Sequence, residues 1–182
     1  LLESVFYLST GKSFRTARNQ ELIRFGAEFA DLSCTLFSGG REQSLRAVLF
    51  SGRRPRQLYI GGVKQRSAAG LSGVLTTVLF CPDDLLILKS GSSGRRKILD
   101  TALCQLRPKY AQALAEYQKL YDSKSRILKD YHDAPSLLEP LPEFNYRMAQ
   151  VGAVVIAYRA KFLRALSKQA RLYHAEFSGG RE

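Results

Sequence analysis

Cysteine, histidine and tryptophan are scarce in this sequence, which has three cysteines, two histidines and no tryptophan. Cys34, Cys81 and Cys104 form no CxxC pair, and His132 and His174 lie far from any two of them, so the spacing of a zinc site is missing. Two of the cysteines lie inside apolar runs, where a reduced thiol behaves as a small buried hydrophobic group. Reduced thiols are typical of the cytoplasm, which is the predicted location.

Long hydrophobic runs are also missing. The opening LLESVFYLST is apolar, but it has no basic segment before it and is far too short to cross a bilayer. The apolar run 151–157 has charged residues within a few positions on both sides. The sequence therefore predicts no membrane-spanning segment.

Acidic residues are few relative to basic ones. The 182 residues include 28 Lys and Arg against 16 Asp and Glu, a net charge of +12, and the hydrophobic fraction of 45% is ordinary for a globular protein. Residues 1–80 carry 11 bases and 5 acids, and residues 81–182 carry 17 and 11, so each part has a charge of +6. Such a chain attracts polyanions, nucleic acid first and an anionic membrane surface or an acidic partner second.

The first part of the chain has the pattern of a helix followed by a small sheet. Apolar spacing predicts a helix over 1–8 that stops at Gly11. Apolar and polar residues then alternate in three stretches, which predict an antiparallel meander with one solvent-exposed face: 29–37, 43–52 and 56–62. The β-branched run that ends segment 71–80 predicts a buried strand that returns to the core.

The second part has the pattern of helices. Pro82 suits the start of one helix, a second begins near Ser93, and Pro108 opens a longer one. The longer helix carries a heptad-like stripe, Tyr110, Leu114, Tyr117, Tyr121, Leu128 and Tyr131. A last helix over about 145–173 repeats the stripe at Met148, Val151, Val155, Tyr158, Phe162, Ala165 and Leu172. Because the connector holds three prolines, we expect these two helices to pack as an antiparallel hairpin, within an α+β fold.

Two segments carry a resemblance to a known family. LLESVFYLSTGKSFRT (1–16) joins a helix to a basic turn, and LFCPDDLLILKSGSSGRRKILD (79–100) joins an apolar run, an acidic helix start and a Gly/Ser turn. Together they closely resemble the RecF family of ABC/SMC-like ATPases. The resemblance runs from Leu1 to Glu182 and is strongest at 1–16, 79–100 and 107–120. It departs at 121–125, where family members often have Gln-Arg-Asn, and near Phe144, where they often have tryptophan.

The resemblance implies an internal segment of an ATPase. In the family, a phosphate-binding loop of the GxNxxGKT type directly precedes the residues that match Leu1 and Leu2. The signature motif, the Walker B acids and the D-loop are also expected outside this sequence, and the catalytic residues with them. The resemblance further implies a partial ATPase head lobe over 1–106 and a truncated helical lid over 107–182.

The basic turn KSFRT is the first candidate site. A planar guanidinium can neutralise phosphate charge through paired hydrogen bonds. By resemblance to the arginine loop of RecF-like and SMC-like ATPases, Arg15 and Lys12 are predicted to bind the nucleotide. A solvated basic turn is the alternative.

Two further segments are candidate sites. Asp83 of CPDDL matches an acidic position of the family and is predicted to help hold Mg²⁺, which needs only one or two protein carboxylates; the alternative is a pair of helix-capping acids. The turn GSSGRRKILD opens a helix with two arginines, so Arg95 and Arg96 are predicted to contact DNA phosphate or, alternatively, to form salt bridges. It is not a Walker A loop, because Lys97 is followed by Ile98.

The remaining candidates surround the predicted hairpin tips and are basic: Arg53, Arg54, Arg56, Lys64 and Arg66. Arg53, Arg54, Lys64 and Arg66 are predicted to bind the DNA backbone, since phosphate contacts position a protein without reading sequence. Solvated loops are an equally good interpretation. The tyrosines of the heptad-like stripe are assigned to packing, since base stacking explains their spacing less well.

The family resemblance implies an ATP-dependent DNA-binding protein of replication, recombinational repair and the SOS response. Such a protein would bind ATP and Mg²⁺, form an ATP-dependent homodimer, bind gapped or duplex DNA, and promote RecA loading with RecR, without a membrane partner. Hydrolysis would be a slow switch, and residues 1–182 alone would be inactive.

Two alternatives stay open. One is another SMC-like ATPase, such as an overcoming-lysogenisation-type nuclease or a chromosome-organising protein, which would need a longer coiled coil or an added nuclease domain. The other is a non-enzymatic basic module whose hairpin binds protein partners. The codons before Leu1 and after Glu182 separate them, because only an ATPase would have a phosphate loop upstream and Walker B acids downstream.

Overall fold

The short helix α1 (Leu2–Thr10) ends at a glycine because the chain must turn sharply there. Gly11 has φ of +67°, and its backbone N–H donates to the Tyr7 carbonyl oxygen over 2.7 Å. The computed structural model in which we describe this helix covers residues 1–87, 89 and 91–181, without the side chain of Asp83. It divides into two compact units, Leu1–Pro108 and Lys109–Glu182.

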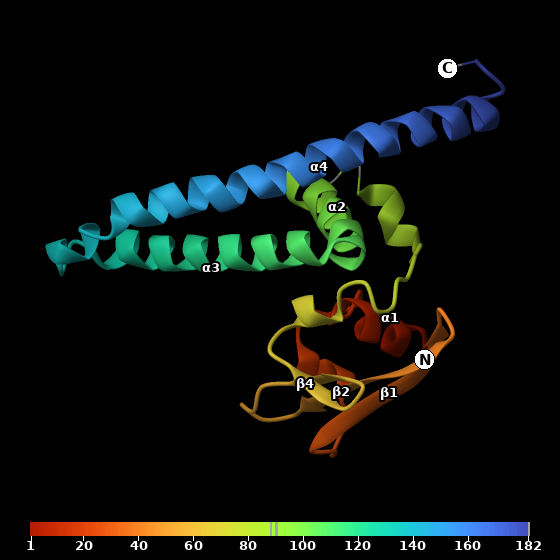
Figure 1. Ribbon diagram of the computed structural model, residues 1–182, viewed down its shortest axis with the longest axis horizontal. Coiled ribbons are helices and arrows are strands. Elements are labelled where there is room, and N and C mark those ends of the chain that lie inside the picture. The colour runs from red at the N-terminus through yellow and green to blue at the C-terminus, as the bar shows by residue number, and fades with distance from the viewer. Residues whose placement is uncertain (88, 90, 182) are drawn as a thin grey trace. The chain divides into compact units, whose positions relative to one another are not determined.

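A four-stranded antiparallel sheet follows α1 in the first unit (Figure 1). Its strands lie in chain order, β1 (Phe29–Ser38), β2 (Arg41–Phe50), β3 (Gln57–Ile60) and β4 (Val63–Gln65). The predicted meander is confirmed. β4 was not predicted, because Gly61 and Gly62 were assigned to the end of a strand, whereas both take positive φ values and turn the chain into a new one.

One face of the sheet packs against α1 and forms the core. Every second residue of β2 points to this face, where Leu45, Ala47 and Leu49 are completely buried. They pack with the buried Tyr7 and Leu8 of α1. The alternating pattern thus predicted the buried face of the sheet correctly.

The rest of the first unit consists of short turns and one longer helix. Three 3₁₀ segments lie between the other elements, η1 (Asn19–Leu22), η2 (Ala68–Leu71) and η3 (Pro82–Leu86). They are followed by α2 (Ser92–Leu106), which begins one residue before the predicted start. The helix predicted at Pro82 is only the single turn η3.

The strand predicted over 71–80 is wrong. Leu71 lies in η2, and no residue of 76–80 pairs with a strand in the described part of the chain. Thr77 instead pairs with a side-chain amide: its N–H donates to Gln105 Oε1 over 2.7 Å, and Gln105 Nε2 donates to the Thr77 carbonyl over 3.2 Å. Without a ladder of backbone partners, β-branched composition alone does not make a strand, and Val78 and Phe80 are exposed.

The second unit is an antiparallel helical hairpin, as predicted. Helix α3 (Pro108–Asp130) leads through η4 (Pro135–Leu138) into α4 (Leu141–Ser178), which runs back alongside it (Figure 1). The Tyr110 and Tyr158 rings meet edge to face with centroids 5.8 Å apart. Further along, Arg147 Nε donates to Glu116 Oε1 over 2.7 Å.

The boundaries and the stripe of the hairpin differ in part from the prediction. Helix α4 begins four residues before Asn145, because Pro142 lies in its first turn, where no N–H is needed. Tyr121, Leu128 and Leu172, expected on the packed stripes, are about half exposed. A straight α-helix drifts by about 20° per heptad, so one partner helix cannot cover a long heptad stripe.

Replacement of Gly11 should destabilise the protein more than replacement of a positive-φ glycine with open space around it. Both Gly11 and Gly26 have positive φ, which disfavours alanine. The Cβ of Gly11→Ala would also lie 2.6 Å from Ala68 Cβ, whereas the Cβ of Gly26→Ala would meet nothing within 4 Å. We expect a loss of about 3 kcal/mol for Gly11→Ala and about 1 kcal/mol for Gly26→Ala in urea unfolding. Equal losses would show that the contact with Ala68 is unimportant.

Arg46 should set the acidity of a carboxyl on the exposed face of the sheet. Its Nε donates to Asp31 Oδ1 over 2.9 Å, and this hydrogen bond holds the Asp31 pKa below its ordinary value of 3.8. The contact therefore adds stability above about pH 4, and this stability is lost as pH falls through the lowered pKa. In Arg46→Gln, an NMR titration should show a higher Asp31 pKa; an unchanged value would contradict the assignment.

Candidate functional site

The chain doubles back after α1, so that the predicted basic turn lies along this helix. Ser13 Oγ holds the turn: it accepts from the backbone N–H groups of Arg15 and Thr16 over 3.0 and 3.1 Å. The same hydroxyl donates to Glu3 Oε1 over 2.5 Å. Ser13 thereby connects the turn that holds Arg15 and Thr16 to Glu3 in the first turn of α1.

Arg15 reaches the beginning of α1 through this turn. Its Nε and Nη2 donate to Glu3 Oε2 over 3.4 and 3.3 Å, and its side chain is 59% exposed. A guanidinium has five N–H donors, so donors remain for a second acceptor. Lys12 is exposed near the other end of α1, and its ammonium has no hydrogen bond or ion pair within the described residues.

Arg56, directly before β3, fixes the end of α1. Its Nη1 donates to the Gly11 carbonyl oxygen and to the Tyr7 hydroxyl, the latter over 2.8 Å. The Tyr7 hydroxyl in turn donates to Asn19 Oδ1 over 3.2 Å, and the guanidinium lies 5.7 Å from the Tyr7 ring centroid. The sequence grouped Arg56 with exposed loop arginines; the structure gives it a packing role beside the basic turn.

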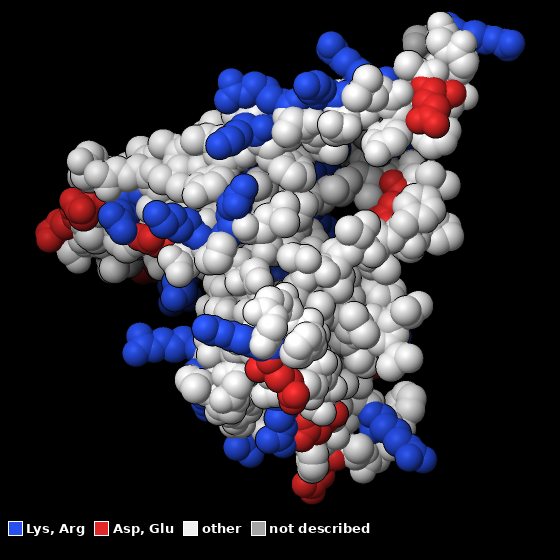
Figure 2. Space-filling view, turned by 45° about the vertical axis from the view of Figure 1, so that its right-hand side comes forward, with Lys and Arg blue, Asp and Glu red and all other residues white. Residues whose placement is uncertain are grey.

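The predicted DNA-binding residues in and beside the sheet are exposed. Arg53 and Arg54 lie in the bend after β2, where the Arg54 guanidinium stacks 4.2 Å from the Phe50 ring centroid. Lys64 belongs to β4, and Arg66 follows it. In the lower part of Figure 2, basic side chains alternate with acidic ones. Among the described residues, no hydrogen bond or ion pair joins these groups into one site, so their role stays a prediction.

Arg95 and Arg96 are the fourth and fifth residues of α2, where its first turn ends. Gly91 is the N-cap residue, the Gly94 N–H donates to the Gly91 carbonyl over 3.1 Å, and the first turn contains no acid. Both arginines are exposed. The helix dipole and the two side chains give this turn a positive potential, which suits an anion.

The structure leaves the predicted magnesium ligand untested. The Asp83 side chain lies outside the described residues, while its neighbour Asp84 caps η3: Asp84 Oδ2 accepts from the Cys81 N–H over 2.8 Å. Across the described residues, no group of three or more His, Cys, Asp or Glu could hold a metal ion. Any Mg²⁺ would depend on the nucleotide for most of its ligands.

A buried polar network was missed by the sequence. Ser9 and Gln105 are almost completely buried, and both contact Thr77. Ser9 Oγ lies 2.6 Å from Thr77 Oγ1, and Gln105 binds the Thr77 backbone as described above. These bonds tie α1 and α2 to the segment before η3. No periodic pattern marks three residues so far apart in sequence.

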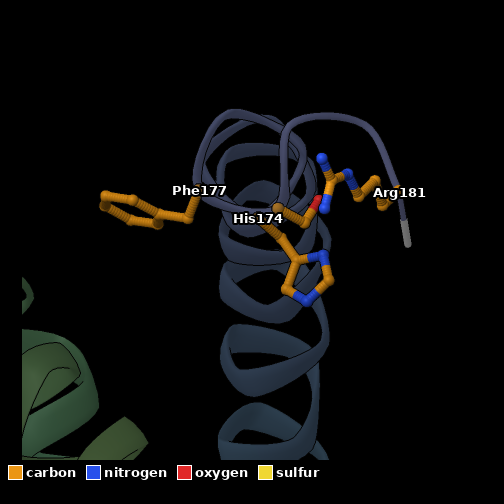
Figure 3. A pocket seen from close by; sticks show the side chains of 4 residues that line it. His174, Phe177 and Arg181 are labelled. Carbon is orange, nitrogen blue, oxygen red and sulfur yellow. The ribbon is translucent and has the colours of Figure 1, made fainter.

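The surface hollow at the end of α4 has no enclosed site. It is lined by His174, Phe177, Ser178 and Arg181, and Figure 3 shows the Phe177 ring pointing away from His174 and Arg181. Phe177 is 86% exposed.

The cysteines form no disulfide in the described structure, and burial raises the pKa of the Cys34 thiol. None of the described helices has both the length and the apolar character of a membrane span.

The comparisons with known proteins agree over the whole chain. The DNA replication and repair protein RecF of Ruminiclostridium cellulolyticum is 31% identical over 183 residues, and that of Lacticaseibacillus casei is 34% identical over 185. Both matches cover 100% of this chain and 49% of the relative, so the chain spans about half the length of the curated relatives it matches. No protein-family model matches.

Solved structures give the same result. The recombination mediator protein RecF of the RecFOR pathway, as RecF-ATPrS, has a TM-score of 0.88 and 27% identity over 98% of this chain and 48% of that one. The RecF-ATP structure has a TM-score of 0.84 and 28% identity over 97% and 48%. The fold is thus that of part of an ABC/SMC-like ATPase lobe with a helical hairpin. More narrowly, the chain is similar to RecF proteins over its whole length and to about half of theirs.

Loss of the Arg56 guanidinium should destabilise the first unit. Arg56→Gln leaves the carbonyl oxygen of the buried Gly11 and the Tyr7 hydroxyl without this donor, which should cost about 1–3 kcal/mol in urea unfolding. Arg53→Gln, which removes an equal charge from an exposed bend, should change stability by less than about 0.5 kcal/mol. A loss that is the same for both variants would mean that charge alone is responsible.

Proposed function

We propose that this chain is part of a RecF-like ATP-dependent DNA-binding protein that acts in replication and recombinational repair. The match to RecF proteins over the whole chain supports this role. The RecF structures named with ATP and ATPrS support a nucleotide as cofactor, with Mg²⁺ as its expected counterion. The basic composition of the chain supports DNA, gapped or duplex, as a ligand.

The placement of Arg15 is the observation on which the nucleotide assignment depends. The turn brings its guanidinium to the first turn of α1, where unpaired backbone N–H groups and the helix dipole favour an anion. Arg15 would exchange its exposed contact with Glu3 for a phosphate oxygen, and Lys12, near the other end of α1, would bind the nucleotide as a second positive charge. Asp83 would supply a carboxylate to Mg²⁺.

The wider activity follows from the family likeness. The whole protein would dimerise around ATP, hydrolyse it slowly as a switch, and act with RecR to promote RecA loading in the cytoplasm. Arg53, Arg54, Lys64, Arg66, Arg95 and Arg96 would contact the DNA backbone. The division into a head lobe over 1–106 and a lid over 107–182 belongs to the same proposal.

The nucleotide assignment can be tested with two neighbouring arginines. In the whole protein that contains this chain, Arg15→Ala should weaken ATP binding about tenfold, because a charge-assisted hydrogen bond to phosphate is lost. Arg18→Ala is the matched control: Arg18 also forms an exposed ion pair, with Glu21 over 3.8 Å. Titration with a fluorescent ATP analogue measures both, and equal affinities for the two variants would contradict the role of Arg15.

A further inference from the structure

Helix α4 carries a row of cations that neither packing nor the proposed nucleotide site uses. Four exposed basic residues follow steps of three and four along it: Lys161, Arg164, Lys168 and Arg171. At 3.6 residues per turn they fall within an arc of about 80° and extend over about 15 Å of helix. We call them the α4 row. Within the described part of the chain, none of the four has an ion pair or hydrogen bond through its side chain.

The α4 row faces away from the seam of the hairpin. Val151 and Val155 are buried and Tyr158 contacts Tyr110 on the side that faces α3. The middle of the row lies about 130° around the helix from these residues. Because Tyr110 near the start of α3 is opposite Tyr158, α4 continues past the end of its partner helix (Figure 1). The row therefore begins close to the part of α4 that packs against α3, and it extends along a stretch of α4 that α3 does not cover.

The stretch of α4 that carries the row contains no acidic residue. Between Phe144 and Ala175 the helix contains Arg147, Arg159 and the four cations of the row, but no Asp or Glu. In Figure 2, basic side chains lie along the top of the view, and acidic groups lie toward its left and right ends. Like charges at steps of three and four repel one another, so the row weakens α4 unless an anion covers it.

We propose that the α4 row is a track that binds the phosphate backbone of a polynucleotide. The inference rests on the proposed function, which supplies DNA as the ligand, and it adds a site on the hairpin. A nucleic-acid strand in a duplex carries one phosphate for about every 3.4 Å of axis, so a row of about 15 Å faces about four phosphates, one for each cation. Contacts of this kind hold the backbone and read no bases.

The decisive quantity is the salt dependence of binding. Each phosphate contact contributes about 0.9 to the slope of log affinity against log salt concentration for duplex DNA, and about 0.7 for a single strand. The quadruple variant Lys161→Gln, Arg164→Gln, Lys168→Gln, Arg171→Gln should therefore reduce the slope by about 3. Between 50 and 200 mM salt, the unmodified whole protein should lose about 50–150-fold more affinity than this variant.

A second quadruple variant controls for net charge. Lys109→Gln, Lys119→Gln, Arg126→Gln and Lys129→Gln remove the same charge from four exposed positions spread over α3, none of which has a side-chain partner among the described residues. This variant should keep a slope within about 1 of the unmodified protein. Since glutamine forms helices about as well as lysine and arginine, circular dichroism should show equal helix content in all three proteins.

Each outcome decides between the two proposals. Equal slopes for the unmodified protein and the α4 variant would overturn the track while leaving DNA binding elsewhere intact. Equal reductions for both variants would also overturn it, because net charge would then be the cause. A whole protein that binds neither single-stranded nor duplex oligonucleotides would contradict the proposed function itself. If the α4 variant lost binding to anionic phospholipid vesicles while its DNA binding stayed unchanged, the track would be overturned and the α4 row would be assigned to a membrane surface.

Discussion

The left-handed conformation at Gly11 is the constraint on which the candidate site depends. It ends α1 and sends the chain back along the helix, and its carbonyl accepts a hydrogen bond from Arg56. Ala68 fills the space that a side chain would need, so only glycine fits without a shift. Because the turn is fixed at this point, Ser13 and Arg15 meet Glu3, and a residue that follows the C-terminal end of α1 lies at its beginning. The Arg15 guanidinium of the basic turn is thereby placed where it can face a phosphate bound at the start of α1.

The first unit is held together by a few specific polar contacts laid over a small apolar core. Arg56 joins the sheet to the end of α1, while the bonds among Ser9, Thr77 and Gln105 join α1 to α2. Buried polar groups are costly unless each finds a partner, so such networks hold their elements in one arrangement. Both networks meet on α1, which is the element that the proposed nucleotide site uses. A ligand at α1 would therefore act on a helix that is tied to both the sheet and α2.

The sequence predicted the elements whose patterns repeat, and it failed where partners decide the structure. Alternation located β1, β2 and the buried face of the sheet, and the glycine at position 11 located the end of α1. The strand expected over 71–80 was wrong because pairing, which composition does not encode, determines whether a β-branched run becomes a strand. The site followed the same rule. Arg15 was recognised from its motif, but its contact with Glu3 and the packing role of Arg56 needed the three-dimensional turn.

A nucleotide-bound structure of the whole protein, refined to a resolution that defines side chains, tests the central claim most directly. In this structure we expect the Arg15 guanidinium to leave Glu3 and to donate to a phosphate oxygen of ATP at about 3 Å, with the backbone of the Gly11 turn unchanged. A structure in which ATP is bound while Arg15 still donates to Glu3, and in which no phosphate lies near the first turn of α1, would contradict it.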